Sequence, residues 1–131
     1  MKWGLVAELA LLGLAIGVAI VYGLPESAGW LAWIVLRIAG AIWIARAVRR
    51  SHFANGFAAG YLGATAAVLS GAVLYGTYTA NHPEFVENAA TAAPKIEPRL
   101  LLALLSLLIG LAHGFLQGVL AFAAGKIVTS R

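Results

Sequence analysis

Four long apolar segments constrain this chain more than any other feature of its sequence. They cover about residues 4–24, 28–47, 53–78 and 100–124. Each is close to the roughly 17–25 residues that a helix needs to cross about 30 Å of hydrocarbon. Hydrophobic residues make up 62% of the chain and charged residues 11%, whereas soluble domains have about 45–50% and about 25%. The sequence therefore predicts one all-α membrane domain over residues 1–131, a bundle of four transmembrane helices.

Basic residues bracket these segments and predict the orientation of the bundle. Two lie on one side, Lys95 and Arg99, and the others on the opposite side: Lys2, Arg46, Arg49, Arg50, Lys126 and Arg131. The richer side is expected to be cytoplasmic, which places both termini inside. The net charge of +4 thus indicates membrane topology rather than nucleic-acid binding. Because Glu26 occupies the position where a signal-peptide cleavage site needs a small residue, we expect the first segment to be an uncleaved anchor.

The connections between the segments differ in length. Short turns at residues 25–27 and 51–52 predict that helices one and two, and helices two and three, are antiparallel neighbours. Residues 79–98 form a long external loop, in which Pro83 and Pro94 bound a possible surface helix at 84–93. Trp30, Trp33 and Trp43 lie near the two ends of the second helix, as expected for aromatic belts at the membrane interfaces.

Glycines spaced four residues apart predict close packing between helices. In lipid no hydrophobic force draws helices together, so they associate through close backbone contact and a few polar groups. Such glycines are Gly13 and Gly17, Gly56 and Gly60, and the row Gly110, Gly114 and Gly118. We interpret them as helix-packing residues, and a glycine-lined gap for a substrate or pigment is the alternative.

Polar side chains within the apolar segments are candidate functional residues, because burying them in a membrane costs free energy. Arg37 lies halfway along the second helix and Glu8 about one turn inside the cytoplasmic end of the first. Ser106, His113 and Gln117 share one stripe of the fourth helix with Gly110. These five polar residues form the predicted intramembrane site, in which Arg37 turns inward. Its expected partners are Glu8, Gln117, Thr65, Ser70 or the backbone carbonyls beside the glycines.

The sequence offers little for catalysis. It has no cysteine, and it lacks paired carboxylates, a histidine with an acidic partner at helical spacing, a phosphate-binding loop and a metal-ligand cluster. We therefore expect no enzyme activity, no metal and no cofactor. Haem or chlorophyll binding at His113 is a lesser alternative, because a glycine beside this histidine leaves room for a flat ring. His52 and His82 belong to opposite membrane faces, so neither supplies a second axial ligand.

Three stretches carry a resemblance to a known family. They are the basic turn ARAVRRSHFANGFAAGYLGA, the helix exit YGTYTANHPEFVEN and the closing LLIGLAHGFLQGVLAFAAGKI. With these, most of the chain resembles a bacterial family of small four-helix membrane proteins of unknown function. The resemblance implies a protein of the bacterial inner membrane and supplies no catalytic residues. The chain departs from that family in its shorter external loop, and His113 matches no family position.

These observations predict a membrane scaffold or accessory subunit that acts through helix packing. We expect the protein to be surrounded by the lipid bilayer and to assemble as a homo-oligomer or as a hetero-oligomer with other membrane proteins. The alternative is a small oligomeric transporter or channel whose path is lined by Arg37, His113 and Gln117.

Overall fold

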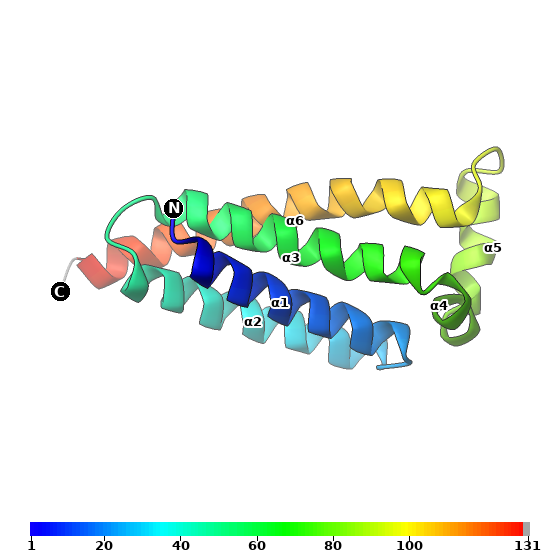
Figure 1. Ribbon diagram of the computed structural model, residues 1–131, viewed down its shortest axis with the longest axis horizontal. Helices are drawn as coiled ribbons and strands as arrows, with labels where there is room; N and C mark the ends of the chain where they lie inside the picture. Colours follow the sequence, from blue (N-terminus) through cyan, green and yellow to red (C-terminus); the bar gives the residue numbers. More distant parts are fainter. Residues whose placement is uncertain (130–131) are drawn as a thin grey trace.

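The computed structural model describes residues 1–129, which form a helical bundle (Figure 1). Four helices are long: α1 (Trp3–Val21), α2 (Glu26–Ala47), α3 (His52–Val73) and α6 (Pro98–Thr129). Two short helices, α4 (Tyr75–Asn81) and α5 (Pro83–Ala92), lie between α3 and α6. The long helices are each apolar and long enough to cross a membrane. The expected all-helical class with four possible membrane spans is thereby confirmed.

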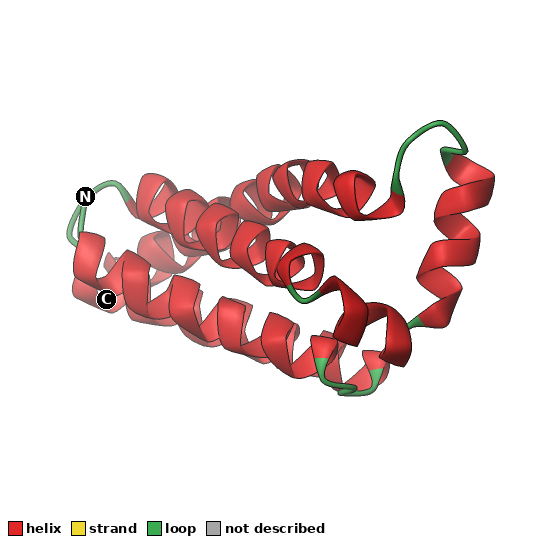
Figure 2. Ribbon diagram, turned by 45° about the vertical axis from the view of Figure 1, so that its right-hand side comes forward, coloured by secondary structure: helices red, strands yellow, loops and turns green. Residues whose placement is uncertain are grey.

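The third helix is shorter than expected, because α3 ends at Val73 rather than continuing to Tyr78. Leu74 has φ −97° and ψ 41°, and Figure 1 shows that α4 beyond it turns away from the direction of α3. The region between α3 and α6 is also largely helical, because α4 and α5 occupy most of the predicted loop. Figure 2 shows α5 running across the end of the bundle.

The break after α3 brings the end of α4 onto the end of α1. The side-chain amide of Asn81 donates a hydrogen bond to the carbonyl of Val21 at 3.1 Å. His82 Nε2 donates to the carbonyl of Ile20 at 2.8 Å. The last carbonyls of a helix lack partners within that helix. A straight continuation of α3 would leave these carbonyls without the partners that Asn81 and His82 provide.

Helix α3 packs mainly against α6 and α1, whereas α2 packs mainly against α6 and α1 on the other side. The prediction that helices two and three are close neighbours is therefore wrong, since α2 has only minor contact with α3. The connection 48–51 makes this possible, because Val48 is extended and Ser51 has a left-handed backbone with φ 62°. The connection therefore does not fold α3 back directly onto α2.

Glycines let α3 approach both of its neighbours closely. A Cβ atom added to Gly60 would lie 2.6 Å from the carbonyl oxygen of His113 on α6. A Cβ atom added to Gly13 on α1 would lie 3.0 Å from Cα of Gly63. Gly114 and Gly118 of α6 contact Phe57 and Phe53 of α3 in the same way. The glycine row on α6 thus serves a contact within the chain.

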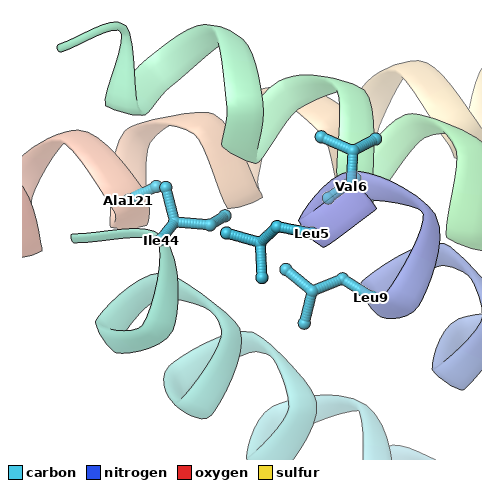
Figure 3. Packing of buried hydrophobic residues seen from close by; sticks show 6 residues of the cluster. Leu5, Val6, Leu9, Ile44 and Ala121 are labelled. Carbon is cyan, nitrogen blue, oxygen red and sulfur yellow. The ribbon is translucent and has the colours of Figure 1, made fainter. Parts of the chain in front are cut away.

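The two ends of the bundle differ in how they are filled. At the end where α1 begins and α6 ends, an apolar core is formed by Leu5, Val6, Leu9, Ile44, Ala59 and Ala121 (Figure 3). Toward the other end α2 and α6 diverge (Figure 1). The outer surface carries large exposed apolar side chains such as Leu11, Ile34, Leu108 and Phe115, as expected for a surface that lipid surrounds.

Candidate functional site

A polar cluster of Arg37, His113 and Gln117 joins α2 to α6 inside the bundle. Arg37 donates from Nη1 to the carbonyl oxygen of His113 at 3.3 Å and from Nη2 to the ring nitrogen Nδ1 of the same residue. Gln117 Nε2 donates to the carbonyl oxygen of Arg37 at 3.2 Å. Arg37 is 8% exposed and Gln117 5%. Three of the five polar residues predicted as a site therefore lie together.

The contact with Arg37 determines which ring nitrogen of His113 carries the proton. A guanidinium group has only donors, so Nδ1 must accept the hydrogen bond. The imidazole is then the neutral tautomer with its proton on Nε2. Among residues 1–129, no hydrogen-bond partner of Nε2 is found. His113 therefore presents one unpaired N–H donor.

Trp33 completes this cluster on the side of α2. Its ring meets the His113 ring edge to face, with centroids 5.4 Å apart and an interplanar angle of 85°. The guanidinium carbon of Arg37 lies 5.4 Å from the centroid of the Trp33 ring, within the range of a cation–π interaction. The arginine charge is thus stabilised by hydrogen bonds to one residue and by the ring of another.

Glu8 and Ser106 do not join the cluster. Glu8 is exposed on the outer surface of α1, and in the described part of the chain it forms no ion pair. Of the partners expected for Arg37, Glu8 is therefore not used, and a backbone carbonyl beside a glycine is, because the carbonyl of His113, next to Gly114, and the ring of His113 supply the acceptors. Ser106 donates to the carbonyl of Ala103 in its own helix at 2.6 Å. Thr65, another expected partner, has a buried hydroxyl without any partner in residues 1–129.

A cavity of about 280 Å³ lies between the four long helices, in the half of the bundle nearer α4 and α5. Small residues form part of its lining. They come from three helices: Gly17 of α1, Gly29 of α2, and Ala64, Ala67 and Gly71 of α3. Gly17 also packs directly on α3, because a Cβ atom added to it would clash with Cα of Ala67.

The lining of the cavity changes from its mouth to its floor. The mouth, defined here as Glu26, Tyr78, His82 and Glu84, lies at the α4–α5 end. The walls include Ile20, Trp30, Val68 and Leu102, and Trp33 and His113 form the floor. His82 and His113 thus lie at opposite ends of one cavity, although residues 1–129 contain no group of three side chains that could hold a metal ion.

One face of α2 supplies much of this lining and was missed as a site in the sequence. Glu26, Trp30, Trp33 and Arg37 follow each other at steps of four, three and four residues, which places them on one side of a helix. Trp30 and Trp33, which the sequence predicts to be interface aromatics, both line the cavity. The spacing to Arg37 is the signal that could have identified them.

The mouth of the cavity is acidic. Of the residues that line the cavity, Glu26 and Glu84 are carboxylates, and none is a lysine or an arginine. Glu84 lies 3.5 Å from Nδ1 of His82. Burial raises the pKa of Tyr78, and the charges of Glu84, Glu26 and, to a lesser extent, the neighbouring Tyr75 raise it further. A cation entering the mouth is therefore favoured over an anion.

Comparison with known proteins gives no relative from which a function could be transferred. No protein-family model, no curated protein and no solved structure matches this chain. The resemblance to a bacterial four-helix family stays a prediction. The function is therefore inferred from the cavity and the polar cluster.

Proposed function

We propose that this chain is a small multi-pass membrane protein that binds a small ligand in the cavity between its four long helices. Ligand sites are typically concave, mainly apolar and equipped with a few polar groups, in pockets of about 300–1,000 Å³. The cavity of about 280 Å³ has this composition and lies just below that range, which favours a small ligand. The single observation that carries the proposal is that the cavity extends from exposed carboxylates at its mouth to His113 within the bundle.

The polar cluster closes the inner end of this cavity. Arg37 and Gln117 connect α2 to α6 next to the floor, and the apolar core around Ile44 fills the bundle beyond them. We therefore expect a ligand to enter from the α4–α5 end. If the protein also transports its ligand, the contact between Arg37 and His113 has to open. The cluster would then act as the inner gate of a transport path.

The charge distribution supports an orientation with the α4–α5 end outside. The basic residues at the opposite end are Lys2, Arg46, Arg49, Arg50 and Lys126, and Arg131 lies outside the described residues. By the positive-inside rule this end faces the cytoplasm. Together with the family resemblance, this supports a location in a bacterial inner membrane, where the ligand would enter from the periplasmic side.

A cavity-filling substitution tests ligand binding. Val68→Trp places a large ring in the cavity, and Leu69→Trp adds the same ring at a side chain that is 40% exposed on the same helix. Binding of choline and of its neutral isostere 3,3-dimethylbutan-1-ol would be measured by saturation-transfer NMR in lipid nanodiscs. We expect Val68→Trp, but not Leu69→Trp, to abolish binding. If neither probe binds the unmodified protein, or if Val68→Trp changes nothing, the proposal is wrong.

An accessory role in a larger assembly is a second candidate, favoured by one observation. Glu8 is a carboxylate on the outer surface of α1 and has exposed Leu11 and Leu12 beside it. A carboxylate at this depth is stabilised by a cationic partner on another membrane protein. Cross-linking in native membranes would then give a defined complex that Glu8→Gln weakens. Recovery of the monomer alone would exclude this candidate.

A further inference from the structure

We propose that the cavity takes an amphipathic organic cation, with its amine at the mouth and its apolar part in the cavity. This inference rests on the proposed ligand-binding function and adds the chemical class of the ligand. It is carried by three features of the lining: its charge, its aromatic rings and its change in polarity with depth.

The charge of the lining is opposite to that of the whole protein. The chain has a net charge of +4, yet Glu26 and Glu84 are the charged carboxylates of the lining and no basic side chain offsets them there. His82 donates from Nε2 to the carbonyl of Ile20, and its Nδ1 lies 3.5 Å from Glu84, so the protonated form of His82 would offset the charge of Glu84 but not that of Glu26. Low-dielectric walls around such a cleft concentrate its field and attract cations.

Aromatic rings at the mouth and on the adjoining wall provide the second contact for an amine. Trp30 and Tyr78 both line the cavity. The Tyr78 ring is held between His82 and Phe85, at centroid distances of 4.9 and 5.5 Å. The faces of tryptophan and tyrosine attract ammonium groups, and quaternary ammonium ligands are recognised in this way. The ring of Trp33 already has Arg37 beside it, so Trp30 is the indole that remains for a ligand.

The change in polarity with depth orients the ligand. Ile20, Val68 and Leu102 line the walls and suit an apolar group. Behind the floor, the charge of Arg37 repels a second cation. Seven residues separate Glu26 from Trp33 along α2, about 10 Å at about 1.5 Å per residue. The ammonium group therefore stays near the mouth, and the apolar part extends toward His113.

Choline and 3,3-dimethylbutan-1-ol test this inference, because they share a shape and differ in one positive charge. Their affinities would be measured in nanodiscs of phosphatidylglycerol, a lipid without an ammonium group. We expect choline to bind at least about tenfold more tightly. The double substitution Glu26→Gln and Glu84→Gln should remove this preference and leave the affinity of the neutral alcohol unchanged. Glu87→Gln on α5, whose side chain does not line the cavity, is the matched control.

The outcomes separate the two proposals. If the alcohol binds as tightly as choline and the glutamine substitutions change neither affinity, the cavity binds ligands but its preference for cations is disproved. If neither probe binds, the proposal that the cavity binds a ligand is disproved. A second series with phosphatidylcholine in the nanodiscs identifies the source of the cation. If phosphatidylcholine competes with choline for binding, the natural cation is a lipid headgroup. If phosphatidylcholine does not compete, the natural cation is a free amine.

Discussion

Arg37 shows how a single charged side chain is accommodated inside an apolar bundle. Its guanidinium is bonded to the carbonyl and ring of His113 and lies beside Trp33. Insertion scales assign a central arginine a cost of about 2.5–3.5 kcal/mol, which these contacts offset. The inward turn of Arg37 follows from its position in the sequence. The sequence leaves its partner open among several candidates, because the acceptors lie on a helix that the sequence alone cannot align with α2.

His113→Ala should destabilise the bundle. The substitution removes the ring that accepts from Arg37, and a buried donor that loses its acceptor costs about 1–3 kcal/mol. The free energy of unfolding would be measured by denaturant titration in detergent. The control is Leu111→Ala, at a side chain that is 50% exposed on the same helix, which should change the free energy of unfolding little. Equal stability of His113→Ala and the unmodified protein would show that the cluster does not hold α2 to α6.

Tyr78 should make the folded protein sensitive to alkaline pH. Its pKa is raised above the ordinary value of 10.0 by burial and by Glu84 and Glu26, so the folded state favours the neutral phenol. This contribution to stability is complete below the ordinary pKa and is lost as the pH rises through the higher folded value. The melting temperature would be compared with that of Tyr78→Phe between about pH 8 and pH 11. As the pH rises, the melting temperature of the unmodified protein should fall more steeply than that of Tyr78→Phe. Equal falls in the two melting temperatures would contradict a raised pKa of Tyr78.

At the scale of helices, hydrophobic length was enough to predict the four long elements and the small-residue spacing enough to predict close contacts. Two features depended on tertiary contacts instead. The break at Leu74 is favoured by the hydrogen bonds of Asn81 and His82 to α1, which no local pattern encodes. The separation of α2 from α3 reflects an extended connection and the close glycine contacts of α3 with α1 and α6.

Gly60→Ala tests those close contacts. Its Cβ atom would lie 2.6 Å from the carbonyl oxygen of His113 and 2.7 Å from Cβ of Gln117, so α3 and α6 would have to separate. Overpacking of this kind costs about 1–3 kcal/mol. Gly4→Ala is the control, because nothing lies within 4 Å of its Cβ position. Thermal unfolding in detergent should show a lower melting temperature for Gly60→Ala but not for Gly4→Ala. An unchanged melting temperature of Gly60→Ala would rule out close packing at this site.

The whole molecule combines a filled half and a hollow half, divided by the polar cluster. The apolar core around Ile44 occupies one half, and the cavity of about 280 Å³ occupies the other. Such a cavity could not be predicted from the sequence, because it depends on how far apart four helices lie. The sequence does contain its lining, in the small residues of α3 and in the stripe from Glu26 to Trp33 on α2.

Reaction of introduced thiols tests the central claim, a water-accessible cavity inside a membrane bundle, most directly. The chain has no cysteine, so each substitution gives one reactive group. In intact membranes, a positively charged methanethiosulfonate reagent added from the α4–α5 side should modify Val68→Cys in the cavity. Leu69→Cys on the lipid-facing side and Ala59→Cys in the apolar core should stay unmodified. Equal protection of all three thiols would contradict the cavity, and with it the function proposed for this protein.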